Sequence, residues 1–247
     1  MRHEPLEAVL DRGGVVLREL DGVRYLTYPA LDELPGVRAL TTLRQPGDSA
    51  LAAILERWDR PIENVAGTVV QWLGRAFEAP EASVASGRQV HADHFVVVSP
   101  ENAPAPGELR RFDEIDALMT YKPHVALVVL TADCLPIFIA DAEARAVCLV
   151  HAGKAGTGKQ ITLQVAQAFL GELCTDPRNT AALIGPSIGD GCYPQRLWEE
   201  NTAQLRAAGI EQIIHSGLCT RCNLDAMHSY RAEKGCTGRM LSTIMLV

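Results

Sequence analysis

The 247-residue sequence contains no long hydrophobic run, which argues against a membrane-spanning protein. Its longest uninterrupted apolar stretch, Val125 to Leu130 (VALVVL), is far too short to cross a bilayer. Acidic residues at Glu4, Glu7 and Asp11 break up the first segment, so this segment holds no signal-peptide core. We therefore expect a cytoplasmic protein with no membrane partner.

An excess of positive charge is also lacking. Lys and Arg total 23 against 30 Asp and Glu, a formal net charge of −7, which argues against a protein whose main work is to neutralise nucleic-acid phosphates. With 47% hydrophobic and 21% charged residues, the composition is that of an ordinary globular chain, and no internal repeat is visible. We expect one domain over residues 1–247, a small-molecule ligand and no nucleic-acid partner.

Seven cysteines are an odd number in a chain without an export signal, which predicts reduced thiols. Cys219 and Cys222 form a single CxxC motif (CTRC). A structural zinc would need two further ligands, for which Cys236 or His228 could serve, and a redox role would need a thioredoxin-like context. Neither context is evident, so ordinary reduced cysteines are the favoured interpretation.

Alternation and turn residues predict the first elements of the chain. Residues Val23 to Arg44 indicate two short strands around a Pro-rich turn. A helix is expected over Ser49 to Trp58, with Ser49 as its N-cap, and a second helix over Asn64 to Phe77.

Two strand-like runs, Pro136 to Ala140 and Ala146 to Val150, follow the apolar stretch already noted. The residues between them, Asp141 to Arg145, have the composition of a turn, which predicts a hairpin. Cys134 lies seven residues before this turn and His151 six residues after it. Both side chains are therefore expected near the same open end of the hairpin, close enough to touch.

A glycine-rich segment, HAGKAGTGKQ, follows the hairpin and precedes a run with helical periodicity, ITLQVAQAFLGEL. A strand, a glycine loop and a helix in this order aim backbone N–H groups at an anion. The segment is one residue short of a Walker A motif because Gln160 stands where Ser or Thr would hold magnesium, which disfavours a nucleotide-hydrolysing P-loop. The alternatives are a plain tight turn and an anion site formed by Lys154, Lys159 and a helix that starts near Lys159.

Three residues with metal-ligating side chains stand out: His91, Cys134 and His151. A Cys/His/His set with one open position is what a catalytic zinc requires. Taken singly, each has a structural alternative as a core or surface residue. His94 forms an HxxH pattern with His91 and is a minor alternate ligand.

From about Thr41 onward, the chain resembles the multicopper polyphenol oxidase-like family, also called the YfiH or laccase-domain-containing family. The resemblance rests on motifs in order and spacing, of which the TADC and VHAG pair is highly specific. GVRALTTLR also resembles the arginine-bearing opening motif of the family, with Arg44 in the arginine position. The other motifs are RQVH (88–91), LTADCLPIFIAD (130–141), VHAGKAGTGKQI (150–161), IGPSIGDGCYP (184–194) and SYRAEKGCTGRMLSTI (229–244).

The resemblance implies a zinc ion held by His91, Cys134 and His151. It also implies purine nucleoside phosphorylase activity, in which adenosine, inosine or methylthioadenosine and phosphate give the base and a ribose 1-phosphate, with adenosine deamination as a companion activity. The implied fold is a single-domain α/β (α+β) layered sandwich, similar to the catalytic domain of cytotoxic necrotizing factor toxins.

A zinc phosphorylase needs an anion site beside the metal, and the candidates for it are Arg44, Lys154 and the amides of the glycine loop. Asp133, which precedes Cys134, is a candidate orienting group or proton carrier, and a solvated or capping aspartate is its alternative. Cys134, Asp133 and Arg44 are therefore the catalytic candidates.

The sequence departs from the family pattern around the predicted pocket. Lys154-Ala155 stands where the family has Trp-Arg, Pro46-Gly47 stands for Gly-Gly, and an Asn-Leu-Gly motif is not recognisable. Ser187 replaces the first cysteine of a glycine–cysteine motif, whereas Cys192 keeps the second. Zinc binding is therefore better supported than substrate identity.

Three alternatives stay open. Seven histidines with no HxH pair cannot build a multicopper centre, so laccase-like polyphenol oxidation would come from copper in the zinc site. Cys134 and His151 could instead form a cysteine hydrolase or deamidase. The third alternative is a non-catalytic metal-binding partner protein.

Overall fold

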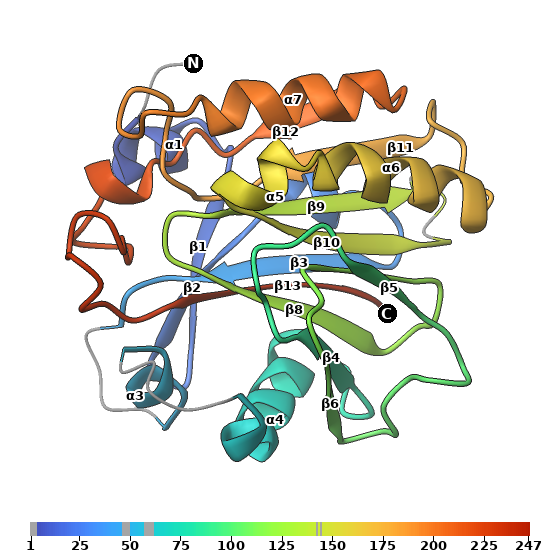
Figure 1. Ribbon diagram of the computed structural model, residues 1–247. Coiled ribbons are helices and arrows are strands. Elements are labelled where there is room, and N and C mark those ends of the chain that lie inside the picture. Colours follow the sequence, from blue (N-terminus) through green and yellow to red (C-terminus); the bar gives the residue numbers. More distant parts are fainter. Residues whose placement is uncertain (1–3, 46–49, 57–61, 142, 144) are drawn as a thin grey trace.

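Two β-sheets packed face to face form the middle of the molecule, and helices cover the outer face of each (Figure 1). The computed structural model describes all residues except 1–3, 46–49, 57–61, 142 and 144. The four layers are helices, sheet, sheet and helices. The layered α/β sandwich predicted from the sequence is therefore confirmed.

The seven-stranded sheet mixes parallel and antiparallel pairs. Across the sheet its strands are β1 (Val16–Leu20), β2 (Val23–Thr27), β3 (Val37–Thr42), β13 (Met240–Leu246), β8 (Val125–Thr131), β4 (Ser83–Gly87) and β6 (Leu109–Phe112). Strand β13 pairs antiparallel with β3 on one side and with β8 on the other. The sheet therefore joins segments from both ends of the described chain.

The six-stranded sheet carries the predicted hairpin at its centre. Across the sheet its strands are β12 (Gln212–His215), β11 (Thr180–Ile184), β9 (Leu135–Asp141), β10 (Val147–Ala152), β7 (Ala117–Thr120) and β5 (Phe95–Val98). Strands β9 and β10 pair antiparallel, with His151 opposite Pro136. Cys134 directly precedes β9, so the hairpin brings it to the end of the sheet where His151 lies, as predicted.

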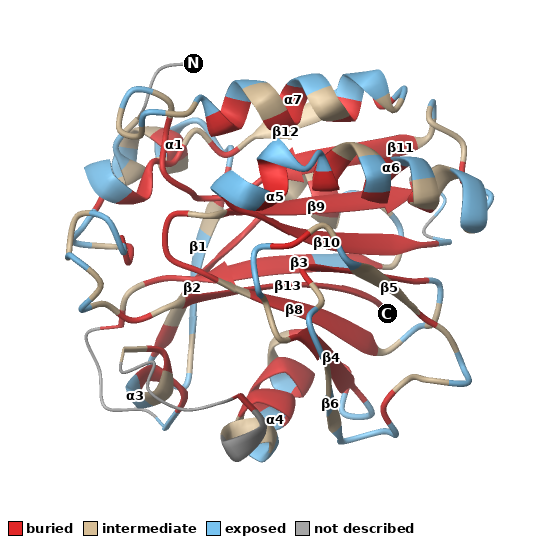
Figure 2. Ribbon diagram, in the orientation of Figure 1, coloured by how far each residue is buried: buried red, intermediate tan, exposed pale blue. Residues whose placement is uncertain are grey.

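Strand β9 is apolar at nearly every position because both of its faces are covered. Ile137 and Ile139 pack into the core under the helices, whereas Phe138 and Ala140 pack into the core between the two sheets. This explains why the strand has a continuous apolar run rather than a polar and apolar alternation. Figure 2 shows the central strands buried along almost their whole length.

Helices α5, α6 and α7 cover the six-stranded sheet, and α3 and α4 lie on the opposite side of the molecule against the seven-stranded sheet (Figure 1). The helical segments are α1 (Leu6–Asp11), α2 (Pro29–Asp32), α3 (Ala50–Glu56), η1 (Ile62–Val65), α4 (Ala66–Ala76), α5 (Lys154–Gly158), α6 (Ile161–Glu172), α7 (Leu197–Ala207) and η2 (Thr220–Cys222). No helix within the described ranges is long and apolar enough to span a membrane.

Most predicted elements are present, with local differences. The two strands expected between 23 and 44 are β2 and β3, with α2 in the turn between them. The first predicted helix is α3, and its proposed cap, Ser49, lies outside the described residues. The second begins as the 3₁₀ segment η1 and continues as α4.

The glycine-rich segment is the main correction to the predicted elements. We expected a loop with a helix starting near Lys159, but α5 already begins at Lys154, with Gly153 as its N-cap in an extended conformation. The helical path is broken at Gln160, whose φ of +63° is left-handed, and resumes at Ile161. Glycine lowers helix propensity but does not forbid a helix, and here one short turn packs against α6 and α7.

Candidate functional site

The three predicted metal ligands meet at one end of the six-stranded sheet. His91 lies on the loop between β4 and β5, Cys134 on the turn between β8 and β9, and His151 in β10. Their ligand atoms all lie within 4.8 Å of one another. The two imidazole rings are nearly perpendicular, with centroids 4.9 Å apart. The structure therefore assembles a compact donor set from segments that are up to 60 residues apart in the chain.

The carboxylate of Asp116 holds this donor set in place. It is completely buried just before β7, and its Oδ1 accepts a hydrogen bond of 2.7 Å from Nδ1 of His151. It also accepts backbone N–H groups from Val90, His91 and Ala92 at 3.1, 3.0 and 2.9 Å. Because Nδ1 of His151 donates to a carboxylate, the neutral ring presents its other nitrogen as a lone-pair donor, as a metal ligand must.

Sequence reasoning missed Asp116. Burial acts to raise the pKa of its carboxyl group, but the bond from His151 and the backbone N–H donors outweigh burial and lower the pKa below its ordinary value. A carboxylate is therefore available to orient the histidine. The only signal in the sequence was an aspartate placed directly before a short apolar strand.

Gly153 leaves the space in which the three donors approach one another. A Cβ atom at this position would lie 2.8 Å from Sγ of Cys134 and 2.9 Å from Cδ2 of His91. Both distances are too short for real contacts, so any larger residue would push the sulfur and the imidazole away. The glycine of the VHAG motif, two residues after His151, is therefore required for a steric reason: a side chain here would keep the ligand atoms apart.

The charges of Cys134 and His151 stabilise each other. Burial acts to raise the pKa of the Cys134 thiol, but His151 and His91 outweigh it and lower the pKa to about 6. Burial acts to lower the pKa of His151, but the Cys134 sulfur and the Asp116 carboxylate outweigh it and raise the pKa to about 9. The sulfur is thus kept as a thiolate, which is the form that binds metals and attacks electrophiles.

These residues fit a divalent metal ion with borderline to soft preferences. Imidazole and thiolate donors are the common ligands of zinc and also suit copper, and three protein donors leave one position for a small molecule. The fit rests on the approach permitted by Gly153 and on the orientation of His151 by Asp116. His94 is not part of the group; its Nδ1 lies 3.2 Å from the carbonyl oxygen of Glu114.

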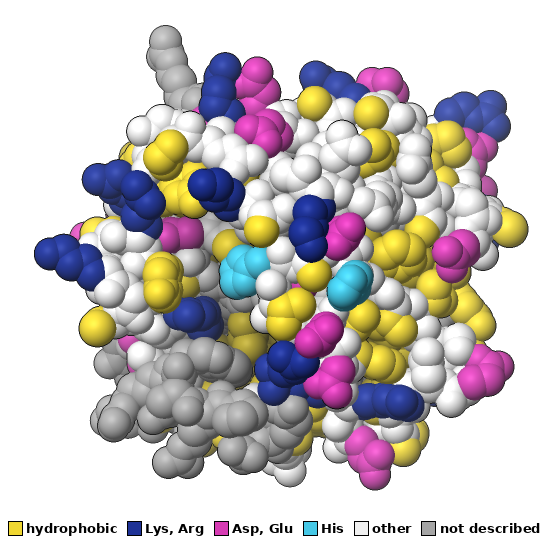
Figure 3. Space-filling view, viewed as in Figure 1, with side chains coloured by type: hydrophobic (Ala, Val, Ile, Leu, Met, Phe, Trp, Pro, Cys, Tyr) yellow, Lys and Arg dark blue, Asp and Glu magenta, His cyan; other side chains and the backbone are white. Residues whose placement is uncertain are grey.

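A cavity of about 740 Å³ opens beside the donor set. Figure 3 shows histidine side chains near the centre of one molecular face, with both basic and acidic side chains around them. Among the described residues that line the cavity, Asp133 is the one carboxylate. The cationic lining residues are Arg111, Lys154, Arg231, Lys234 and Arg239. A chain with a net charge of −7 therefore concentrates positive charge where a small molecule would bind.

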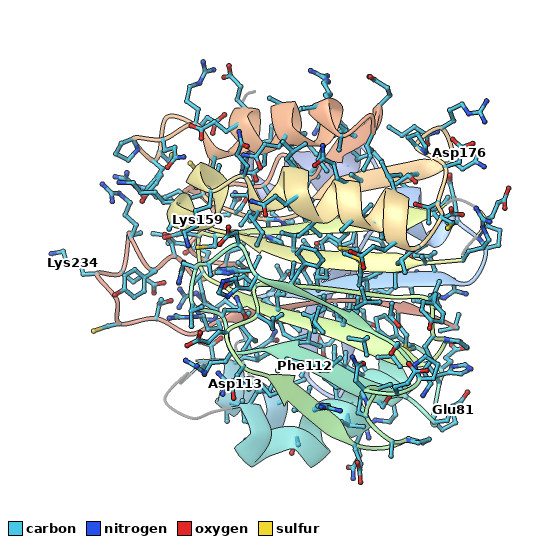
Figure 4. The ribbon with its side chains drawn as sticks, turned by 45° about the vertical axis from the view of Figure 1, so that its right-hand side comes forward. Glu81, Phe112, Asp113, Lys159, Asp176 and Lys234 are labelled. Carbon is cyan, nitrogen blue, oxygen red and sulfur yellow. The ribbon has the colours of Figure 1, made fainter. Side chains whose placement is uncertain are left out.

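Two tyrosine rings form part of the cavity wall. The guanidinium of Arg231 lies 5.0 Å from the ring centre of Tyr193, and that of Arg239 lies 5.7 Å from the ring centre of Tyr230. Lys234 extends outward from the C-terminal loop, residues 223–239 between η2 and β13, which also carries Tyr230, Arg231 and Arg239 (Figure 4). The cavity thus offers flat aromatic surfaces together with cations.

Asp133 links the metal-ligand turn to two other segments. Its Oδ1 accepts a 2.7 Å hydrogen bond from the hydroxyl of Thr220, and its Oδ2 accepts the backbone N–H of Arg231 at 2.7 Å. Its own backbone is in the left-handed region, with φ of +99°. The arrangement suits an orienting group, and a proton-carrying role stays a prediction.

The two predicted phosphate ligands lie in different environments. Lys154 lines the cavity at the start of α5. The guanidinium of Arg44 instead pairs with Glu233 at 2.7 Å and donates to the carbonyl oxygen of Met227 at 3.2 Å, and Arg44 is not among the described lining residues. A phosphate role for Arg44 would require its guanidinium to leave Glu233.

The chain is thus a two-sheet α/β protein with a His/Cys/His donor set at one end of a sheet. Comparison with known proteins identifies its family. The chain belongs to the multi-copper polyphenol oxidoreductase laccase family, whose profile matches residues 58–196 and 194–247. This confirms the family resemblance predicted from the motifs.

The curated relatives of the chain have a different name from the family. The chain is 33% identical over 200 residues to a purine nucleoside phosphorylase of Mycobacterium bovis, covering 70% of this chain and 76% of the relative. It is 33% identical over 184 residues to a purine nucleoside phosphorylase of Deinococcus radiodurans, covering 64% and 68%. These relatives support a nucleoside-processing enzyme with small-molecule substrates.

Solved structures share the fold. The crystal structure of YlmD from Geobacillus stearothermophilus matches with a TM-score of 0.79 at 23% identity, covering 94% of this chain and 99% of that one. The hypothetical protein YfiH of Bacillus licheniformis matches with a TM-score of 0.78, with the same identity and coverage. The likeness to the toxin catalytic domain stays a prediction.

Proposed function

We propose that this chain is a zinc-dependent purine nucleoside phosphorylase with adenosine deaminase activity as a companion. The substrates would be adenosine, inosine or methylthioadenosine together with phosphate, and the products the base and a ribose 1-phosphate. The observation that carries the proposal is the His/Cys/His donor set at the wall of a cavity rich in cations and tyrosines. The names of the curated relatives support the phosphorylase part of the proposal.

His91, Cys134 and His151 are the proposed zinc ligands. When bound, zinc would supply a Lewis acid at the edge of the cavity. The chain itself would bind and orient the two substrates. Phosphate is a compact dianion that prefers cationic donors, whereas a purine is flat and packs well against aromatic rings such as Tyr193 and Tyr230.

Lys154 is the better placed of the two proposed phosphate ligands. It is exposed and lines the cavity at the first position of α5. Arg44 would act on phosphate only in a rearranged state, and otherwise it supports the C-terminal loop through Glu233. Asp133 is proposed to position the turn that carries Cys134, because both of its oxygens accept hydrogen bonds.

The first test is phosphate-dependent release of base from a panel of purine nucleosides, comparing zinc-loaded protein with a metal-free control. Base release that needs both zinc and phosphate is the expected result. Cys134→Ala and His151→Ala should each lose the zinc ion of the His/Cys/His centre, because two remaining donors chelate weakly. Wild-type zinc content in both variants would end the assignment of these ligands.

The phosphate site is tested by Lys154→Ala, with Lys159→Ala as the matched control. Lys159 pairs with Asp93 at 3.3 Å and is not among the described lining residues. We expect a higher phosphate KM for the first variant and an unchanged KM for the second. Arg44→Ala distinguishes phosphate binding by Arg44 from a structural role. A change confined to phosphorolysis would support phosphate binding. Equal loss of phosphorolysis and deamination with zinc retained would support a role in the fold.

A cysteine hydrolase or deamidase is the second candidate, and the Cys134/His151 pair favours it. The pKa of the thiol is lowered to about 6 by the neighbouring histidines, so the metal-free sulfur is a nucleophile. Copper-dependent polyphenol oxidation is consistent with the family name and would use the same donors. Turnover of an ester or amide by metal-free protein would favour the hydrolase, and phenol oxidation that requires added copper would favour the oxidase.

A further inference from the structure

Three cysteines that the proposed reaction does not use meet outside the zinc centre. Cys192 follows a turn after β11, Cys219 is the N-cap of the 3₁₀ turn η2, and Cys222 is its last residue. The three sulfur atoms lie within 4.8 Å of one another, and Sγ of Cys192 is 3.4 Å from Sγ of Cys222. None of the three is in a disulfide. The partners considered for the CxxC motif, Cys236 and His228, are not in this group.

We propose that Cys192, Cys219 and Cys222 form a second metal site, which binds zinc through three thiolates and holds one wall of the cavity in place. Three sulfurs around a tetrahedral zinc, each at about 2.3 Å from the ion, are about 3.8 Å from one another. The observed spacing is already close to this value, so small side-chain rotations would complete the site.

Hydrogen bonds hold the segments that carry the cluster in place. Sγ of the buried Cys219 accepts the backbone N–H of Gly189 at 3.2 Å, which places and polarises the innermost sulfur. Arg221, between the two cysteines of the motif, donates to the carbonyl oxygen of Cys192 at 3.0 Å and so ties the two segments together. The positive charge beside the cluster offsets part of the negative charge that three thiolates and a zinc ion would carry.

A metal site explains this arrangement better than a disulfide. A disulfide would use two sulfurs at about 2.05 Å and leave the third without a function. The sulfur left over would be that of Cys219, which is the one with a dedicated backbone donor. Within the described chain no fourth His, Cys, Asp or Glu joins the group, and Cys222 is exposed. The fourth position of the metal would therefore face solvent.

The cluster is connected to the cavity through short links. Thr220 lies between the two cysteines of the motif and donates its hydroxyl to Asp133, the residue before Cys134. Tyr193 follows Cys192 and lines the cavity. A metal that holds the three cysteines would thereby hold the partner of Asp133 and the Tyr193 ring.

The test is zinc stoichiometry in the full chain, which is reduced, separated from the reductant by gel filtration without oxygen, and titrated with zinc alone. The key variant is Cys222→Ser, because this side chain is exposed and its replacement should not disturb the core. Cys236→Ser is the matched control, an exposed cysteine outside the cluster. Cys134→Ala removes the first site independently.

We expect two zinc ions per wild-type chain and per Cys236→Ser chain, and one in Cys222→Ser. Cys134→Ala should keep one zinc, and with cobalt it should retain the thiolate charge-transfer absorption, since the cluster has three sulfurs and the first site has one. A single zinc that Cys134→Ala loses and Cys222→Ser keeps would overturn the second site. A Cys192–Cys222 disulfide in peptide mapping, with no zinc bound after reduction, would overturn it in favour of a redox pair.

The proposal does not depend on the phosphorylase assignment. If the protein lacks phosphorolysis but Cys222→Ser binds one zinc ion fewer than Cys236→Ser, the second site stands and the proposed function fails. If phosphorolysis is present and Cys222→Ser binds as much zinc as the wild type, the proposed function stands and the second site fails.

Discussion

Replacing Asp116 by Asn should weaken both the metal site and the fold. The side chains have nearly the same shape, so the change removes charge and one acceptor oxygen without opening a cavity. In the wild type Oδ1 accepts from His151 and from the His91 backbone, and Oδ2 accepts from the backbones of Val90 and Ala92. Whichever way the Asn amide is turned, its NH₂ group faces two donors.

The expected loss of stability follows from these four hydrogen bonds. A buried donor left without an acceptor costs about 1–3 kcal/mol, so two of them should lower the free energy of unfolding of the metal-free protein by roughly 2–6 kcal/mol. Loss of the carboxylate that orients a ligating histidine typically weakens metal binding by about 10–100-fold. We therefore expect the Kd for zinc to rise by up to about two orders of magnitude in Asp116→Asn.

The assays are urea unfolding of the metal-free protein and zinc competition against a chromophoric chelator. Asp113→Asn is the matched control, because Asp113 is exposed and pairs only at the surface with Arg88. It should change neither quantity by more than a small amount. Wild-type stability together with wild-type zinc affinity in Asp116→Asn would refute the reasoning that this carboxylate holds the site together.

Three further predictions concern other parts of the molecule. Gly153→Ala should lose the zinc ion of the His/Cys/His centre, because its Cβ would press on the Cys134 sulfur at 2.8 Å. Gly158→Ala, which has open space around it, should bind as much zinc as the wild type in the same assay. Cys134 should resist alkylation in zinc-loaded protein, because a metal-bound sulfur is shielded. After the zinc is removed by a chelator, the alkylation rate, followed by mass spectrometry between pH 5 and 9, should show an apparent pKa of about 6. Fast alkylation with zinc retained would contradict the role of Cys134 as a ligand. The pKa of His215 is lowered to about 4, chiefly by burial, so the folded state favours its neutral form and the unfolded chain binds the proton more readily. The free energy of unfolding should therefore fall as the pH drops from about 6.5 to about 4. In His215→Gln the midpoint of urea unfolding should depend less on pH over this range than in the wild type. An unchanged pH dependence in the variant would disprove the prediction.

The predicted parts of the fold are those encoded by neighbouring residues. The β9–β10 hairpin could be predicted because a polar turn separates two apolar runs, and the meeting of Cys134 with His151 followed from counting residues on either side of that turn. The glycine segment was misjudged for the opposite reason. Its helix forms through packing against α6 and α7, which outweighs the low helix propensity of its two glycines.

The missed parts of the site depend on contacts between distant segments. Asp116 reaches His151 across 35 residues, and nothing in its own neighbourhood marks it as a partner of a histidine. Cys192 and Cys222 are 30 residues apart, so the CxxC motif alone gave no indication of its third member. Arg44 was placed beside phosphate by family resemblance, but its observed partner, Glu233, is 189 residues away. Sequence patterns predict local elements, whereas these pairings require the complete three-dimensional fold.

The central place of β13 sets an order of events during synthesis. This strand, residues 240–246, joins β3 to β8 in the middle of the seven-stranded sheet, and one of its links, between Thr41 and Ser242, spans 201 residues. While the chain is still being made on the ribosome, β3 and β8 each have an unpaired edge facing the gap that β13 will fill. Strand β8 leads directly into the turn that carries Cys134, and until β13 has left the ribosome this strand is paired on one side only, by β4. A nascent chain that exposes His91, Cys134 and His151 but not yet β13 would thus hold a metal poorly, and full binding would appear only once β13 is free to pair.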